Sequence, residues 1–326
     1  MKEQPGHLDQ RDLARILREQ WGLVPGRLRH LPVGFGDHHW ELTGAAGGRW
    51  FVTVAELTGG WRGAGPAAGF ADLRASMQTV TALHRAGLEF AVAPVPTAGG
   101  QALAPLDAGH AVAVFPYVDG AAGDFGDRLP EGDRLALIGI LARLHGATPL
   151  ARRTALARSP TPASRPALEA ALGELGQPWS GGPYSEPARR LLARHAARLG
   201  RALARFDELV HAAAGSGPPV ITHGEPHPGN IMRGGGRLLL VDWDTAGLAL
   251  PERDLWLAAG DDARAAGRYA ELTGRRVSGA AMDLYRLRWD LDDIALSVRD
   301  FRAPHVQNED TALMWDAITE HIGEIG

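Results

Sequence analysis

A carboxylate and an amide with four residues between them form the most chemically suggestive pattern in this sequence. Within ITHGEPHPGNIM (221–232), Glu225 is followed by Asn230, and Asp242 comes twelve residues after Asn230. Asparagine and aspartate offer hard oxygen ligands that suit Mg²⁺. A carboxylate placed before them can orient a hydroxyl group and take its proton during phosphoryl transfer. The order is typical of a kinase-like loop, and the alternative is a surface hairpin without chemistry.

The residues around this pattern restrict its conformation. Pro226 and Pro228 stiffen the spacer between the carboxylate and the amide, and the apolar run 238–241 delivers Asp242 at the end of a strand. His223 and His227 are four residues apart, but the prolines exclude the helix that would bring both rings to one metal ion. We therefore do not predict a histidine metal site.

Composition limits the class of protein. The chain has 326 residues, 45% of them hydrophobic and 22% charged, which is ordinary for a soluble globular protein with one large or two modest domains. A net charge of −4 does not favour a nucleic-acid partner. The absence of cysteine excludes disulfides and thiol chemistry. No apolar run approaches the roughly 18 residues of a membrane span, so we expect a cytoplasmic protein with no membrane partner.

Two regions of different character must position the loop. The first, up to residue 117, predicts a helix over 8–21, strands within 30–44 and 48–59, a helix over 67–86 and two short strands within 90–120. The second, 118–326, predicts helices over 131–146, 166–175 and 187–214, a hairpin around Gly234–Gly236, and helices over 252–326. We expect a small β-rich N-lobe (1–117) and a larger, mainly α-helical C-lobe (118–326).

Four stretches carry a family resemblance: HGEPHPGN (223–230), LVDWDTAGLALPERDLW (240–256), LARLHG (141–146) and YRLRWDLDDIA (285–295). With them, nearly the whole chain resembles the aminoglycoside phosphotransferase family, and is most similar to spectinomycin-type phosphotransferases. The resemblance implies an α+β, bilobal protein-kinase-like fold. It also implies transfer of a phosphoryl group from ATP, with Mg²⁺, to an alcohol group.

The resemblance assigns roles by position. Glu225 stands where the family has its catalytic Asp, and His223 would brace the loop. Asn230 and Asp242 would bind Mg²⁺. Asp254 would be structural and would hold the loop that follows the metal site.

The nucleotide would lie in the N-lobe. Gly34 and Gly36 fit a loop whose backbone N–H groups approach phosphate, although such a pair is often only a turn. By fold analogy, backbone groups of Phe115, Tyr117 and Val118 would read the adenine edge.

The sequence departs from the family at two positions. Glu225 replaces Asp, and Thr53 replaces the lysine that steadies the phosphates. The helix over 67–86 contains no Glu to pair with such a lysine, and the only lysine of the chain is Lys2, so none is expected nearby. One interpretation is a pseudokinase that has lost phosphate binding. The other is a relocated cation, for which the candidates are Arg49, Arg62 and Arg74.

The acceptor would be a hydroxyl-bearing, cationic small molecule. Asp292 and Asp293 align with acidic positions of the spectinomycin-type pattern, and opposite charge would favour recognition. The alternative is that both are surface carboxylates beside arginines. The predicted function is an ATP- and Mg²⁺-dependent O-phosphotransferase for an aminocyclitol or aminoglycoside-like acceptor, of the kind used in antibiotic resistance. The alternative function is a nucleotide- or small-molecule-binding pseudokinase.

Overall fold

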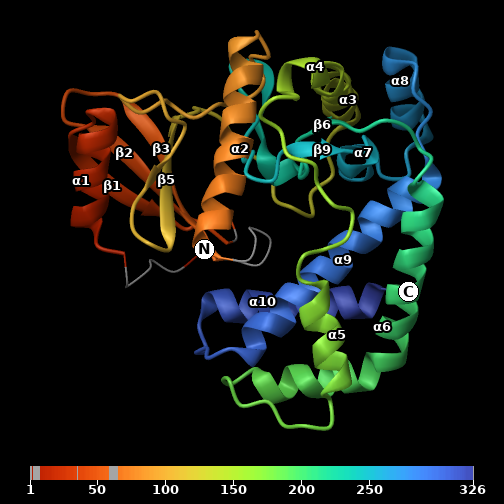
Figure 1. Cartoon of the computed structure of the whole chain (residues 1–326). Helices are drawn as coiled ribbons and strands as arrows, with labels where there is room; N and C mark the ends of the chain where they lie inside the picture. Colours follow the sequence, from red (N-terminus) through yellow and green to blue (C-terminus); the bar gives the residue numbers. More distant parts are fainter. Residues whose placement is uncertain (1, 3–7, 35, 59–64, 326) are drawn as a thin grey trace. The chain divides into compact units, whose positions relative to one another are not determined.

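The structure, a computed structural model, describes residues 2, 8–34, 36–58 and 65–325. The chain divides into two compact units, coloured by sequence in Figure 1. The first comprises Met1–Arg158 with Pro218–Val277, and the second comprises Ser159–Gly217 with Ser278–Gly326. The boundary predicted after residue 117 lies inside the first unit, so the residue limits of the two lobes stay a prediction.

The predicted α+β class is confirmed by a five-stranded antiparallel sheet at the N-terminal end and by the helices that follow it. The strands are β1 (Pro25–Leu31), β2 (His38–Gly44), β3 (Arg49–Glu56), β4 (Ala104–Pro105) and β5 (His110–Pro116), in the order β1-β2-β3-β5-β4. In β3, Val52 and Val54 are fully buried while Thr53 lies on the other, partly exposed face, as strand alternation requires. Pro116 ends β5 and still lies opposite Trp50.

Helix α1 (Gln10–Trp21) covers one face of this sheet (Figure 1). The Asp9 side chain caps its first turn by accepting the Arg11 N–H, and Gly22 ends it in the left-handed conformation that glycine adopts without a steric penalty. Leu13, Ile16 and Leu17 enter a cluster of buried side chains from the sheet. Each fully buried aliphatic side chain contributes about 1.5–3 kcal/mol relative to an exposed one.

Two small strand pairs of the first unit carry the predicted loop and hairpin. They are β6 (Val220–Thr222) with β9 (Gly247–Ala249), and β7 (Ile231–Gly234) with β8 (Arg237–Leu240). The segment that follows helix α2 (Pro66–Arg85) joins the hairpin, because the N–H of Val92 donates to the carbonyl of Leu240 and the N–H of Leu240 donates to Phe90. The hairpin was predicted from the sequence, whereas the pairing of β6 with β9 was not predicted.

Helices make up the rest of both units. In the first they are α3 (Glu131–Gly146), α4 (Thr148–Ala151), the 3₁₀ turn η1 (Pro228–Asn230), α7 (Glu252–Ala259) and α8 (Ala263–Thr273). In the second they are α5 (Arg165–Gly173), α6 (Ser185–Ala213), α9 (Gly279–Arg302) and α10 (Glu309–Glu324). Helix α3 matches its predicted limits, and α5 and α6 do so within two residues; α4 was missed. None of the helices in the described ranges is long and apolar enough to cross a membrane.

Helix α9 is the centre of the second unit, where α5, α6 and α10 pack against it. His321 on α10 reaches two of its carboxylates, with Nδ1 2.9 Å from Asp290 and Nε2 3.0 Å from Asp293. Burial lowers the pKa of His321, but the hydrogen bonds to both aspartates outweigh burial and raise the pKa to about 10. The imidazolium therefore links α10 to α9 at neutral pH.

We expect this link to weaken as pH rises. Because the folded pKa of His321 lies above its unfolded value of about 6.5, the stabilisation is fully present below pH 6.5 and is lost as pH rises through about 10. The difference in unfolding temperature between wild type and His321→Gln should be largest near pH 6 and should shrink towards pH 10. His195→Gln, on α6, is the matched control. A difference that does not change with pH would contradict the assignment.

Candidate functional site

His223 connects the start of the 223–230 loop to the strand that precedes Asp242. Its ring is fully buried, with Nε2 2.9 Å from the carbonyl oxygen of Val241 and Nδ1 3.2 Å from the backbone nitrogen of Glu225. The N–H of Glu225 can only donate, so Nδ1 accepts, and Nε2 carries the proton that is donated to Val241. Burial lowers the pKa of His223, which favours this neutral form.

The carboxylate of Asp254 holds the first residues of the same loop by hydrogen bonds. Asp254 is fully buried, and its oxygens accept the backbone N–H groups of His223 (2.9 Å) and Gly224 (2.6 Å). Burial raises the pKa of Asp254, but the hydrogen bond and charge of His145 and the nearby charges outweigh burial and lower it. The prediction that Asp254 holds the loop after the metal site is wrong, because it holds the loop that contains Glu225.

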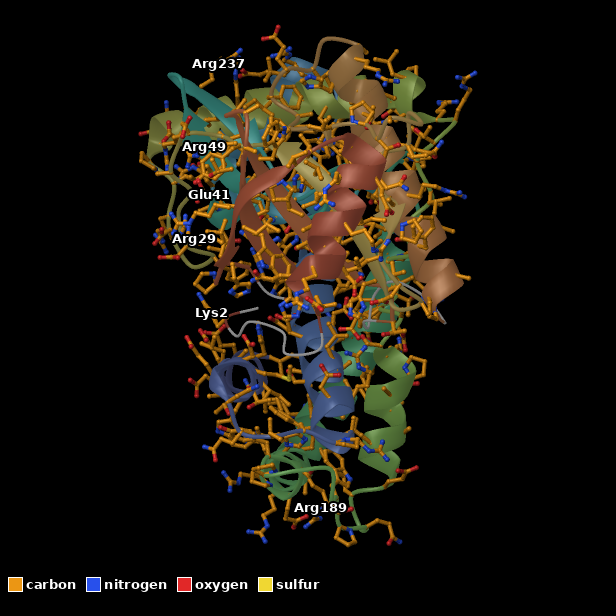
Figure 2. All side chains as sticks on the ribbon, turned by 90° about the vertical axis from the view of Figure 1, so that its left-hand side faces the viewer. Lys2, Arg29, Glu41, Arg49, Arg189 and Arg237 are labelled. Carbon is orange, nitrogen blue, oxygen red and sulfur yellow. The ribbon has the colours of Figure 1, made fainter. Side chains whose placement is uncertain are left out.

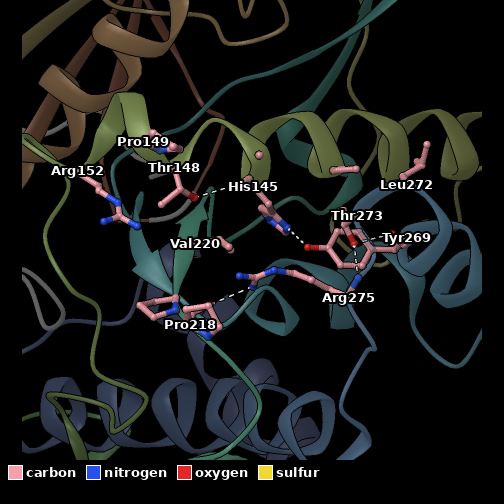
Figure 3. A pocket seen from close by; sticks show the side chains of 13 residues that line it. His145, Thr148, Pro149, Arg152, Pro218, Val220, Tyr269, Leu272, Thr273 and Arg275 are labelled. Carbon is pink, nitrogen blue, oxygen red and sulfur yellow. Dashed lines mark hydrogen bonds between the residues drawn. The ribbon is translucent and has the colours of Figure 1, made fainter.

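His145 on α3 supports Asp254 in turn, with its Nε2 3.0 Å from that carboxylate. Its Nδ1 lies 2.7 Å from the hydroxyl of Tyr269 (Figure 3). Because Nε2 donates to the carboxylate, Nδ1 accepts from Tyr269, whose pKa is raised by burial so that the hydroxyl keeps its proton. His145 and Tyr269 also line a cavity of about 370 Å³. His145 stands in LARLHG, but that stretch gave no indication of this role.

Gly224 permits the tight turn between His223 and Glu225. Its φ is +108°, and a Cβ atom at this position would overlap the guanidinium of Arg253 and approach the hydroxyl of Thr245 to 2.5 Å. Arg253 in turn donates to the hydroxyl of Thr222. A side chain at position 224 would therefore displace the group that packs under the loop.

Asn230 and Asp242 stand at the two ends of the β7–β8 hairpin, Asn230 just before β7 and Asp242 two residues after β8. The N–H of Val241 donates to the carbonyl of Asn230 (3.0 Å), so Asp242 is one residue beyond that contact. The amide nitrogen of Asn230 donates to the carbonyl of Glu225 (3.0 Å), which leaves the amide oxygen as the atom able to coordinate a metal ion. The backbone of Glu225 is thus held by His223 on its N–H side and by Asn230 on its carbonyl side.

Asp242 has the backbone conformation expected of a functional residue. Its φ of +62° is the only positive value at a non-glycine residue in the described part of the chain. Such a conformation costs about 1–3 kcal/mol, and it persists where the surrounding structure enforces it. Asp242 is also exposed, so an ion from solvent can reach it.

These residues fit Mg²⁺ held jointly with a nucleotide. No group of three or more His, Cys, Asp and Glu side chains in a metal-binding arrangement occurs among the described residues. Mg²⁺ usually takes one or two protein oxygens and completes its shell with phosphates and water, so Asn230 and Asp242 suffice. Burial lowers the pKa of His227 to about 4, so this neighbour of Asn230 is neutral at pH 7 and does not repel a cation.

A neutral pair occupies the position of the missing lysine. The hydroxyl of Thr53 lies 3.2 Å from Nδ1 of His39, its partner across β2 and β3. Burial lowers the pKa of His39 to about 3, so the ring carries no charge at neutral pH. Gly34 lies against the same ring, since a Cβ atom there would be 3.1 Å from Nε2 of His39. Gly34 and Gly36 both have positive φ, as a loop of closely approaching backbone requires.

The candidate cations are in different situations. Arg49, labelled with Glu41 in Figure 2, is paired with Glu41 (2.8 Å) and Asp119 (2.7 Å), so two carboxylates already compensate its charge. Arg74 is exposed on α2, and its guanidinium lies 6.0 Å from the Phe70 ring centroid. Arg62 lies outside the described residues.

The chain's only lysine lies closer to the glycine loop than its sequence position implies. Nζ of Lys2 donates to the carbonyl of Pro32 (3.2 Å), two residues before Gly34. The expectation of no nearby lysine concerned the strand that carries Thr53, and this contact of Lys2 beside the glycine loop was not predicted. Nothing in the sequence around residue 2 indicates this contact.

The proposed adenine segment is anchored at both ends. The N–H of Tyr117 donates to the carbonyl of Arg49, and the guanidinium of Arg49 lies 3.7 Å from the Tyr117 ring centroid. Beyond Val118, Ala121 exchanges two backbone hydrogen bonds with Arg233 of β7. Phe115, Tyr117 and Val118 are half-buried, and the segment has a fixed path between β3 and the hairpin.

Asp292 and Asp293 lie on α9 in the second unit, and each already has a partner there. Asp292 accepts a hydrogen bond from Ser164 and pairs with Arg288 (3.3 Å). Asp293 pairs with His321, and burial raises its pKa. Their charges are partly compensated within this unit, which weakens the field that either can offer to a cationic acceptor.

Comparisons with known proteins concern the family and the fold. Protein StrN of Streptomyces griseus is 31% identical over 257 residues, which cover 74% of each chain. The fold is shared with spectinomycin phosphotransferase, solved in complex with ADP and spectinomycin (TM-score 0.73, 16% identity, 97% of this chain and 95% of that chain). It is also shared with choline kinase LicA of Streptococcus pneumoniae (TM-score 0.58, 14% identity, 96% and 98%).

At these low identities the solved structures establish the fold alone. The sequence relationship is shown by StrN and by a family model. The model of the phosphotransferase enzyme family matches residues 27–304, which include the glycine loop, the 223–230 loop and Asp242. The chain therefore belongs to the phosphotransferase enzyme family.

Proposed function

We propose that this protein transfers a phosphoryl group from ATP to a hydroxyl group of a small molecule, with Mg²⁺. One observation carries the proposal. His223 and Asn230 tie the backbone of Glu225 to the residue that precedes Asp242. These bonds hold together the segments that carry a carboxylate, an amide and a second carboxylate, the groups that phosphoryl transfer uses. The solved complexes of related folds with ADP and with an ATP analogue support a nucleotide donor.

Each residue has a distinct task in this proposal. Asn230 and Asp242 would hold Mg²⁺, which supplies neutralisation of phosphate charge when bound. Glu225 would orient the acceptor hydroxyl and take its proton, while His223 keeps the loop in place. The side chain of Glu225 is one methylene longer than that of Asp, but its backbone is held on both sides, so the change affects reach and not the path of the loop.

The acceptor class is inferred from likeness and charge. The likeness to spectinomycin phosphotransferase favours an aminocyclitol or aminoglycoside-like acceptor, and Asp292 and Asp293 would recognise its amino groups. A macrolide 2'-phosphotransferase also shares the fold, so the acceptor panel should include macrolides. Such a reaction in the cytoplasm would serve antibiotic resistance.

The second candidate function is a nucleotide-binding pseudokinase. The neutral pair of Thr53 and His39 favours it, because the phosphates meet no charge at the position where the family pattern has lysine. The two functions differ in whether a phosphorylated product forms.

The proposed metal ligand Asp242 can be tested by product formation. Incubation with ATP, Mg²⁺ and a panel of aminocyclitols, aminoglycosides and macrolides should give a product 80 Da heavier than one acceptor by mass spectrometry, the mass of an added phosphoryl group. Asp242→Asn should reduce its formation by about 100-fold or more, because an amide cannot neutralise Mg²⁺. Asp261→Asn, on the surface after α7, is the control. Binding of nucleotide without any product would support the pseudokinase.

Another prediction concerns the carboxylate of the loop. Glu225→Gln should lower kcat roughly 100-fold, the lower end of the effect of a general base, with little change in ATP affinity. Glu225→Asp, which restores the family residue, should retain more activity than Glu225→Gln. Steady-state kinetics and calorimetry of ADP binding measure both effects. An unchanged kcat in Glu225→Gln would remove this residue from the mechanism.

A further inference from the structure

Helix α2 lacks the glutamate that pairs with lysine in kinases, but it carries Asp72 and Ser76 one turn apart. Both contact Arg158, which lies at the end of the first unit's first segment. Nη1 of Arg158 is 2.7 and 2.8 Å from the two carboxylate oxygens of Asp72, and Nη2 donates to the hydroxyl of Ser76 (2.7 Å). The carboxylate on this helix is therefore bound by an arginine from a distant part of the chain.

The same guanidinium reaches the segment that begins with Asp242. Nη2 and Nε of Arg158 donate to the carbonyl oxygen of Ala246 at 2.8 and 3.2 Å. Ser76 also donates to this oxygen (3.2 Å). Ala246 closes a turn with Trp243, which is fully buried, so its position determines the path of the chain just after Asp242.

Arg158 is held rigidly enough to act as a fixed point. Its backbone N–H donates to the carbonyl of Leu248 on β9, and the N–H of Leu248 donates to Leu156. Gly247 makes room for the arginine, because a Cβ atom there would be 2.5 Å from Nε of Arg158 and 2.7 Å from the carbonyl oxygen of Leu156. The arginine side chain is only 16% exposed, so water competes weakly for its partners.

We propose that Arg158 is a positioning residue that fastens α2 to the segment 242–247 and so presents Asp242 to Mg²⁺. The inference rests on the proposed function. In kinases, the pair of a lysine on β3 with a glutamate on the following helix and the contact of the metal-binding Asp with Mg²⁺ must both be in place. Here Thr53 cannot form that pair, and the arginine joins the helix directly to the segment that follows Asp242. Charge-assisted bonds to Asp72 and a buried carbonyl give the contact its geometry.

The test compares Arg158→Met with Arg153→Met, an exposed arginine of the same segment. Calorimetry of ADP binding with and without Mg²⁺ separates metal binding from nucleotide binding. In Arg158→Met, the gain in ADP affinity on adding Mg²⁺ should fall at least tenfold relative to Arg153→Met, while ADP affinity without Mg²⁺ stays within about twofold. The half-saturating Mg²⁺ concentration for product formation should rise by a similar factor.

A second variant guards against loss of folding in Arg158→Met. Asp72→Asn keeps the shape of the side chain and removes its charge, and should lower the Mg²⁺ effect several-fold without lowering the unfolding temperature as far as Arg158→Met does.

The outcomes distinguish the two proposals. Wild-type protein whose ADP affinity does not respond to Mg²⁺ would overturn the proposed function and this inference together. A wild-type response that persists unchanged in Arg158→Met and in Asp72→Asn would overturn the positioning role alone. A decrease in unfolding temperature with an unchanged Mg²⁺ response would show that the contact is only structural, and would also overturn it.

Discussion

The arrangement of the site depends on one buried carboxylate, that of Asp254. It accepts hydrogen bonds from the N–H groups of His223 and Gly224. These two residues directly follow β6, where the strand no longer pairs with β9. Without this acceptor, each buried N–H group would cost about 1–3 kcal/mol. His145 and Tyr269 orient the carboxylate from α3 and α8. The helices thus determine where the 223–230 loop begins.

The position of Asp242 follows from anchors on both sides of it. On one side, Val241 is bonded to Asn230 and to His223, and on the other side Ala246 is bonded to Arg158. The left-handed backbone of Asp242 lies between these two fixed points, and its cost of about 1–3 kcal/mol is offset by the bonds that flank it. A strained carboxylate between rigid anchors does not need to reorganise when it binds an ion, which is the arrangement that favours electrostatic catalysis.

Local features of the site could be predicted from the sequence, and contacts between distant segments could not. The hairpin that joins Asn230 to Asp242 is a short-range element with a glycine turn, so spacing alone revealed it. Helix α3 was recognised because its apolar positions recur along one face. By contrast, the contact of Arg158 with Asp72 joins residues 86 positions apart. The pairing of His39 with Thr53 depends on strand register, and nothing in either stretch specifies it.

The charges near Thr53 and Asn230 bear on whether the protein transfers a phosphoryl group or only binds a nucleotide. At neutral pH His39 and His227 are uncharged because burial lowers their pKa, and Arg49 is compensated by two carboxylates. In the proposed reaction, most of the phosphate charge would therefore be neutralised by the metal ion, and its two protein ligands, Asn230 and Asp242, would be correspondingly important.

The most direct measurement is a crystal structure of the protein with ADP and Mn²⁺ in place of Mg²⁺, with the metal located by anomalous diffraction. We expect an anomalous difference peak for Mn²⁺ about 2.1 Å from both the amide oxygen of Asn230 and the carboxylate of Asp242, and in contact with a phosphate oxygen. ADP bound with the metal away from these two residues, or with no metal at all, would contradict the central claim.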